Sequence, residues 1–474
     1  MQDTLRFPHH FPGESVTPYT EFLSSKQHAP KMAGFTPLWV PDKAFGYQRS
    51  LIEWNIRKGR SATFADCGLG KTIMNLTFAQ NVVMHTNRPV LYLTPLAVGA
   101  QTVKEGEKFG IECVRSSDGK FPVGARVIVS NYERLHYFDR EQFSGVVCDE
   151  SGILKNYDGV TKAAITDFLL KIPYRLLSTA TAAPNDYVEL GTSSEALGEL
   201  GYQDMLTQFF RKENQKDHRG WGRLKYYMKS HATTDFWRWV CSWARAVRKP
   251  SDLGFSDDGF ELPPLITREH VVQARVKRPG RLFDVPAETL EEQREERRRT
   301  LRERCEKVAE LIGTDREPAV AWCHLNDESE LLTELIPGAV EVTGSQSDEK
   351  KEELLEAFTA GQIRVIVTKS ALAGFGLNWQ HCARETFFPS HSFEGWYQAV
   401  RRCWRFGQKN RVLVDVVTSE GERGVLENLK RKAAAADAMF ENLVRLMNAE
   451  LNIQRSNPFT KTEKVPQWLC STKW

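Results

Sequence analysis

The sequence predicts an α/β protein made of two parallel-sheet domains with a helical insertion between them. Two series of short apolar segments, separated by helical patterns, support this fold class, and a stretch rich in aromatic residues with no strand pattern lies between the series. Apolar strands that alternate with helices indicate a parallel sheet covered on both faces. The 474 residues suffice for about two or three domains, each with its own core.

The first series occupies residues 45–189, after an N-terminal extension (1–44) that is rich in Pro and His. The expected strands of this series are 61–67, 90–95, 126–131, 145–150 and 174–180. Helical patterns separate them, for example at 71–85 and 157–172.

The second series occupies residues 263–455, after the expected helical insertion at 190–262. Its expected strands are 319–323, 339–344, 364–370, 384–389 and 411–419, with a further possible strand within 260–272. The mixed-charge run near 288–312 is expected to be a solvated helix or spacer, because acidic and basic residues interleave. Residues 456–474 are expected to form an exposed tail.

Composition excludes some functions and leaves others open. The balance of 64 Lys+Arg against 61 Asp+Glu gives a net charge of +3, which rules out a histone-like polycation but not a local basic groove. No stretch approaches the about 18 apolar residues of a membrane span, and the first residues lack a signal pattern. The nine cysteines are scattered without a CxxC pair, so neither a zinc site nor a disulfide framework is expected. We therefore expect a cytoplasmic protein that is neither secreted nor bound to a membrane.

The strongest local pattern is ADCGLGKT (65–72), which directly follows a strand and precedes a helix. Its glycines allow backbone amides to approach phosphate oxygens at a helix N-terminus, whose dipole favours anions. Lysine at this position reaches the β- and γ-phosphates, and the threonine hydroxyl binds Mg²⁺. A chance turn is the alternative, since the strict motif begins with Gly rather than Ala65. The expected nucleotide-binding residues are Cys67, Gly68, Leu69, Gly70, Lys71 and Thr72.

A pair of carboxylates, Asp149 and Glu150, ends the apolar segment GVVCDE (145–150). Ligands of open α/β sheets bind at the carboxyl edge of the strands, where this pair is expected to lie. Asp149 is expected to hold Mg²⁺ and Glu150 to orient or deprotonate the attacking water. Adjacent carboxylates are also common on protein surfaces, so the pair gains its meaning from the phosphate pattern upstream.

In the second series, RRCWRFGQ (401–408) spaces Arg402 and Arg405 along one helical face. Arginines in this arrangement can stabilise transition-state charge on a γ-phosphate across a domain cleft. A surface cluster, or a contact with a phosphate backbone, is the alternative.

Together these segments resemble superfamily 2 helicases and translocases, and within them the Swi/Snf-like branch in the compact form of bacteria and bacteriophages. The further matching segments are FGYQRSLIEW (45–54), TPLAV (94–98), SNYERL (130–135), VVCDESGILKN (146–156), STATAAPNDYVELG (178–191), TKSALAGFGLNW (368–379) and YQAVRRCWRFGQ (397–408). The resemblance implies two RecA-like domains that bind ATP and Mg²⁺ in the cleft between them. It also implies that Gln48 reads the adenine, that Gly374 and Gly376 form a glycine-rich turn at the site, and that Gln398, Arg402 and Arg405 sense the nucleotide.

The resemblance also implies contacts with a nucleic-acid backbone. The expected contact residues are Thr94, Asn131, Tyr132, Thr368 and Lys369. Hydroxyls, amides and positive charge suit backbone recognition without base reading. The Trp-rich insertion is expected to supply helical core, with a duplex-covering surface as the alternative, and the insertion or the tail could bind a protein partner.

Two departures from the family pattern concern coupling. The family's Asp-Glu-Ala-His reads Asp-Glu-Ser-Gly here, so Gly152 lacks the side chain that would transmit nucleotide state to the next motif. That next motif is shifted, with Thr181, Pro184 and Asn185 in place of the usual Gly-Thr-Pro core. Coupling is therefore expected to use another route.

The sequence thus predicts an ATP-dependent DNA translocase or helicase that moves along duplex DNA. Two alternatives stay open: a strand-separating DNA or RNA helicase, and a slow ATP-switched clamp or assembly factor on DNA.

Overall fold

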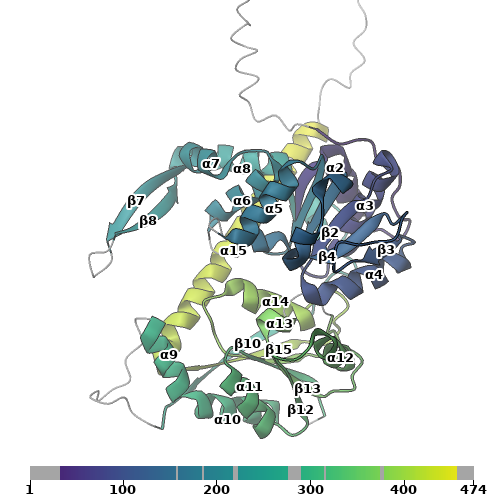
Figure 1. Cartoon of the computed structure of the whole chain (residues 1–474). Coiled ribbons are helices and arrows are strands. Elements are labelled where there is room, and N and C mark those ends of the chain that lie inside the picture. The colour runs from purple at the N-terminus through teal and green to yellow at the C-terminus, as the bar shows by residue number, and fades with distance from the viewer. Residues whose placement is uncertain are drawn as a thin grey trace, which may run out of the picture.

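The computed structural model describes residues 32–155, 159–183, 186–216, 222–275, 290–313, 316–373 and 378–455. Within these residues the chain forms two lobes, one above the other in Figure 1, and each lobe is built around a parallel sheet. The predicted α/β class with two parallel sheets is confirmed.

Lobe 1 contains a sheet with the strand order β3-β4-β2-β5-β6-β1-β9, in which all neighbours are parallel. Its strands are β1 (Arg60–Ala65), β2 (Val90–Thr94), β3 (Cys113–Arg115), β4 (Val127–Asn131), β5 (Gly145–Asp149), β6 (Tyr174–Thr179) and β9 (Ala244–Val247). Its helices are α2 (Gly46–Lys58), α3 (Lys71–Thr86), α4 (Gly99–Lys108), α5 (Val160–Leu170), α6 (Leu190–Leu197), α7 (Tyr202–Phe209) and α8 (Thr233–Trp243). The five strands predicted for this series are confirmed as β1, β2, β4, β5 and β6, and almost all their residues are buried.

Lobe 2 contains a sheet with the order β10-β15-β14-β11-β13-β12, again parallel throughout. Its strands are β10 (Leu265–Val272), β11 (Ala319–Cys323), β12 (Ala339–Val342), β13 (Val365–Lys369), β14 (Arg384–Phe387) and β15 (Val412–Ser419). Its helices are α9 (Leu290–Arg299), α10 (Leu301–Ile312), α11 (Asn326–Leu335), α12 (Asp348–Thr359), α13 (Ser370–Ala373), α14 (Phe393–Cys403) and α15 (Arg423–Arg455). All six strands predicted here are confirmed.

The expectation of a strand-free insertion is wrong. β7 (Phe210–Lys216) and β8 (Gly222–Met228) form an antiparallel ribbon that projects from lobe 1 in Figure 1. Further along, β9 pairs with β1 and extends the first sheet. Charged and polar residues interrupt both strands of the ribbon, and Arg245 interrupts β9, so neither has the apolar run by which the other strands were found. The tryptophans of α8 belong to the core, as expected: Trp237, Trp239 and Trp243 are buried.

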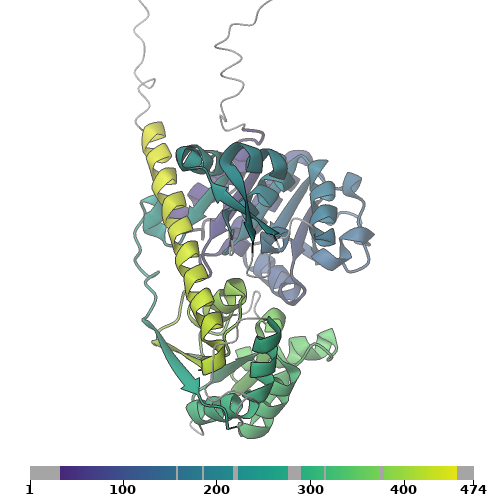
Figure 2. The same cartoon turned by 90° about the vertical axis from the view of Figure 1, so that its left-hand side faces the viewer.

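Helix α15 belongs to both lobes. It starts beside lobe 2 and runs past lobe 1, as the long helix in front in Figure 2 shows. Met439, Phe440, Leu443 and Met447, in its C-terminal half, are buried in the core of lobe 1. The domain boundaries inferred from the sequence stay a prediction, but this helix ties the lobes together. No helix among the described residues is both long and apolar enough to cross a membrane.

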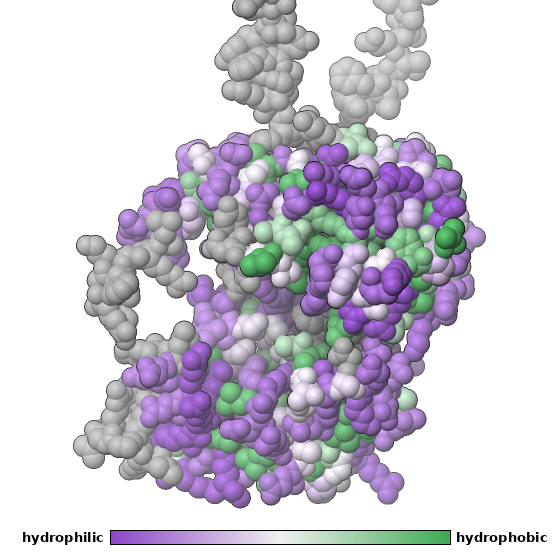
Figure 3. Space-filling view, in the orientation of Figure 1, coloured by the Kyte–Doolittle hydropathy of each residue, from purple (hydrophilic) through white to green (hydrophobic). Residues whose placement is uncertain are grey.

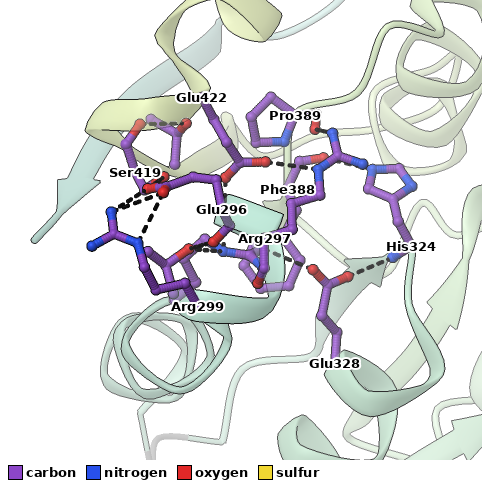
Figure 4. A network of polar contacts seen from close by, with 12 residues as sticks. Glu296, Arg297, Arg299, His324, Glu328, Phe388, Pro389, Ser419 and Glu422 are labelled. Carbon is purple, nitrogen blue, oxygen red and sulfur yellow. Dashed lines mark hydrogen bonds and ion pairs between the residues drawn. The ribbon is translucent and has the colours of Figure 1, made fainter. Parts of the chain in front are cut away.

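The charged run is not a solvated spacer. α10 buries Cys305, Val308 and Ile312 in a core of lobe 2, and the Arg304 side chain is fully buried with them. The guanidinium of Arg304 donates to Glu328 at 2.8 Å. Figure 4 shows the neighbouring polar network, in which Arg297 pairs with the buried Glu422 at 2.8 Å. The mixed-charge segment therefore contains a helix with one buried face, and the buried charges on that face have ionic partners.

Candidate active site

The site is assembled at one edge of the lobe 1 sheet. β5, β6 and β1 are neighbours, so their carboxyl ends meet. The register aligns Asp149 with Ser178 and Phe64 with Thr179. Consequently the glycine loop (residues 66–70, after β1), the carboxylates Asp149 and Glu150 after β5, and the threonines after β6 lie side by side.

The glycine loop has a shape that only glycine adopts easily. Gly68 and Gly70 have φ angles of 88° and 75°, and α3 begins at Lys71 with no side chain capping its N-terminus. Unpartnered amides at a helix N-terminus form a site for an anion such as a phosphate group. The Lys71 ammonium lies at this loop and donates to the Ala65 carbonyl at 3.1 Å.

Gln48 of α2 holds the glycine loop in place by a hydrogen bond. Its Nε2 donates to the Leu69 carbonyl at 3.0 Å, and the Tyr47 hydroxyl donates to the same oxygen at 2.9 Å. The Gln48 Oε1 accepts from the Phe45 amide at 2.9 Å. The structure therefore places Gln48 as a support of the loop, while the reading of adenine stays a prediction.

Asp149 is buried at the end of β5 and held by three polar groups. Asn75 Nδ2 and the Tyr92 hydroxyl donate to its carboxylate at 3.3 and 3.2 Å, and the Glu150 amide donates at 3.1 Å. Burial, and then the charge of Glu150, raise the pKa of Asp149 to about 7, while Lys71 acts in the opposite direction. A cation bound beside Asp149 would stabilise its ionised carboxylate.

Glu150 has a φ angle of 50°, which is unusual for a residue other than glycine. Such backbone strain persists only where the surroundings hold it, and it is concentrated at functional positions. Glu150 also lines a cleft of about 750 Å³ between the lobes, so its carboxylate is reached from solvent. Figure 3 shows the surface hollowed between the lobes, with apolar side chains gathered there.

Lobe 2 brings α14 and the segment after it against the glycine loop. A Cβ added to Gly68 would lie 2.9 Å from the Phe406 amide nitrogen and 3.6 Å from the Arg405 Cβ. Gln398 and Arg402 are buried in α14. Burial lowers the pKa of Arg402 to about 10 and also lowers that of Arg405, with Cys67 acting in the opposite direction on both and Glu150 on Arg402. The predicted arginines thus lie within electrostatic reach of the predicted loop.

Sequence reasoning missed a buried ion pair between the lobes. Asp66 of the glycine loop binds Arg401, with Nε to Oδ1 at 3.2 Å, and it also accepts from the Tyr397 hydroxyl. Both charged side chains are buried. Burial alone would raise the pKa of Asp66, but the charge and hydrogen bond of Arg401 bring it below its ordinary value. The only available signal was Arg401 beside Arg402, which could not reveal a partner 335 residues away.

Four of the five residues predicted to contact nucleic acid are buried in this structure, and their contact with a nucleic acid stays a prediction. They are Thr94, Asn131, Tyr132 and Thr368. The Tyr132 hydroxyl donates to the Asp149 carbonyl at 2.5 Å and the Thr368 hydroxyl to the Val342 carbonyl at 3.2 Å. The hydroxyls of Tyr132 and Thr368 therefore bind the last residues of β5 and β12. Lys369 is half-buried and binds Asn326, and its contact with a nucleic acid stays a prediction.

Several predicted residues lie outside the described part of the chain. They are Gly374 and Gly376 of the glycine-rich turn, and Pro184 and Asn185 of the shifted motif.

The chain matches no protein-family model and no curated protein. Among solved structures it is similar to the Sulfolobus solfataricus SWI2/SNF2 ATPase core in complex with dsDNA. The sequence identity is 16%, the match covers 87% of this chain and 96% of that chain, and the TM-score is 0.41. A likeness of this strength does not assign a function, so membership of the Swi/Snf-like branch stays a prediction and any function must be supported by the geometry of the site.

Proposed function

We propose that the protein is an ATP-dependent DNA translocase or helicase that hydrolyses ATP between its two lobes and moves along duplex DNA. The observation that carries the proposal is the composition of the site. Lobe 1 supplies a glycine loop with a lysine and two carboxylates, and lobe 2 places Arg402 and Arg405 against that loop. A site that needs both lobes can convert hydrolysis into relative movement of the lobes.

The residues present fit ATP and Mg²⁺. Gly68 and Gly70 give the loop its positive φ angles of 88° and 75°, and the N-terminus of α3 has no capping side chain, so its backbone amides suit a phosphate. The carboxylate of Asp149 and the hydroxyl of Thr72 are hard oxygen ligands of the kind that Mg²⁺ prefers. When bound, the metal ion would neutralise charge on the β- and γ-phosphates.

Each protein group then has a defined task. Lys71 binds the terminal phosphates, and Glu150, which lines the cleft between the lobes, orients and deprotonates the attacking water. Arg402 and Arg405 stabilise charge that develops on the transferred phosphoryl group. Because these arginines sit on lobe 2, the rate of hydrolysis depends on how closely the lobes approach.

The ribbon β7–β8 presents exposed basic side chains that suit the backbone of a nucleic acid. The side chains of Arg211, Lys212 and Lys225 are exposed on it, and Lys225 lies over the Tyr227 ring at 5.3 Å. Exposed basic residues on a projecting element can neutralise phosphates without reading bases. This placement also agrees with a net charge of only +3, because the positive charge is local.

The test is steady-state ATP hydrolysis measured with duplex DNA, single-stranded DNA, forked DNA and RNA. We expect duplex DNA to stimulate turnover most, and triplex displacement to accompany it. Fork unwinding without triplex displacement would instead identify a strand-separating helicase. Slow turnover that no nucleic acid accelerates would identify a switch rather than a motor.

A further inference from the structure

We infer that Glu394 is a positioning residue that couples lobe 2 to the water-activating carboxylate, Glu150, by a route that the glycine at position 152 makes possible. The inference rests on the proposed function, because it describes how the same site senses the approach of the lobes. Glu394 thus supplies the other coupling route that is expected because Gly152 has no side chain.

The carboxylate of Glu394 occupies the space that a side chain on Gly152 would fill. A Cβ added to Gly152 would lie 2.6 Å from the Glu394 Oε1, whereas its next neighbours, the Thr179 Oγ1 and the Thr181 carbonyl, are 3.7 Å away. Glu394 lies in the first turn of α14, where the helix dipole favours an acidic side chain. A residue of lobe 2 thus reaches into the strand-end cluster of lobe 1.

Two groups of lobe 1 hold this carboxylate. Lys155, at the end of the 3₁₀ turn Ser151–Lys155, donates to Oε2 in an ion pair. The Thr181 hydroxyl donates to Oε1 at 3.3 Å. The Glu394 side chain is only 12% exposed, so the ion pair is shielded from solvent far more than a surface pair.

From Thr181 the contacts continue to Glu150. The Thr181 amide donates to the Thr179 Oγ1 at 3.1 Å, and the Thr179 hydroxyl donates to the Glu150 Oε2 at 3.4 Å. We call this series, from Glu394 through Thr181 and Thr179 to Glu150, the threonine relay. Since Glu150 has a strained φ of 50°, its geometry depends on such outside support.

The relay makes the orientation of Glu150 depend on lobe 2. When α14 lies against lobe 1, Glu394 fixes Thr181, and the threonines fix the carboxylate that acts on water. When α14 moves away, Thr181 loses its acceptor and Glu150 loses its support. A nucleic acid that favours the approach of the lobes would thereby raise turnover, in proportion to its preference for that state.

The primary test is Glu394→Ala, compared with Glu356→Ala as the matched control. Glu356 also makes an ion pair across the lobes, with Lys104 at 2.9 Å, but this pair is exposed and has no link to the relay. We expect Glu394→Ala to lower the kcat of duplex-stimulated hydrolysis by about 10- to 100-fold, as a misplaced catalytic group does, with KM for ATP unchanged. Glu356→Ala should stay within about twofold, as expected for a surface pair. A kcat of Glu394→Ala within twofold of wild type would overturn the inference.

A double-mutant cycle tests the route. Thr181→Val removes the hydroxyl without changing the shape of the side chain, and if Glu394 acts through Thr181 the double variant should be no slower than the slower single variant. Multiplicative losses would overturn the relay while leaving the proposed function intact. Gly152→Ala should reproduce the loss of kcat, because its Cβ displaces the Glu394 carboxylate. A wild-type protein that hydrolyses no ATP would refute the proposed function itself, and with it the inference.

Discussion

The ion pair between Asp66 and Arg401 offers the sharpest perturbation of the contact between the lobes. Arg401→Ala leaves the Asp66 carboxylate buried with only the Tyr397 hydroxyl and the Cys67 amide as donors. Removing one partner of a buried ion pair costs about 3–5 kcal/mol, because the remaining charge is left uncompensated. At 1.4 kcal/mol per power of ten, the contact should open roughly 100- to 4,000-fold more often.

Amide hydrogen exchange across α14 measures this opening without any need for ATP or DNA. We expect the amides of α14 to exchange about 100-fold faster or more in Arg401→Ala, in line with the loss of several kcal/mol. Arg115→Ala is the matched control. It removes a pair with Glu352 that also joins the lobes, at 3.4 Å, but with both side chains 39% exposed, so exchange of α14 should change little.

The double variant Asp66→Ala with Arg401→Ala separates the cost of the unpaired charge from the value of the pair. Removing both charges should restore part of the protection that Arg401→Ala alone loses. The reasoning is refuted if the α14 amides of Arg401→Ala exchange at the wild-type rate. It is also refuted if the double variant loses as much exchange protection as the two single variants added together.

Two further predictions concern backbone shape and the buried charges of lobe 2. Gly68→Ala and Gly124→Ala should each lower the free energy of unfolding by about 1–2 kcal/mol, because both positions have a positive φ. Only Gly68→Ala places its Cβ against Phe406 and should lower kcat/KM for ATP, since a Cβ at Gly124, with φ 95°, meets no atom within 4 Å. Equal kcat/KM values for the two variants would contradict this. Arg304→Ala should lower the free energy of unfolding by about 3–5 kcal/mol, because it leaves the buried Glu328 without its ionic partner. The exposed Arg302→Ala should lower it by at most about 0.5 kcal/mol. Urea titration measures both, and similar unfolding midpoints would argue against a structural role for Arg304.

The sequence was sufficient to predict most strands of the two sheets, and the reason is physical. β1, β2, β4, β5 and β6 are buried, so apolar residues recur along each of them and indicate a strand. Charged and polar residues interrupt the ribbon β7–β8, β3 has only three residues, and Arg245 interrupts β9, so no apolar run indicates them. The buried face of α10 could not be predicted, because the sequence does not distinguish a buried arginine that has ionic partners from a solvated one.

For the candidate site, the residues that belong to one short segment were predictable and the contacts between segments were not. The glycine loop and the Asp149-Glu150 pair follow from local patterns, because the chain itself supplies the strand, turn and helix. The partners Asp66 and Arg401, or Gly152 and Glu394, lie in different lobes and only the packing of the lobes brings them together. The absence of a side chain at position 152 predicted that some other route is needed, but not which residue provides it.

The most direct test of the central claim is the rate of phosphate release by Glu150→Gln with saturating duplex DNA, alongside ATP binding by the same variant. If Glu150 activates water at a site that both lobes complete, turnover should fall by about 100-fold or more while ATP still binds. DNA-stimulated phosphate release by Glu150→Gln at the wild-type rate would contradict the account.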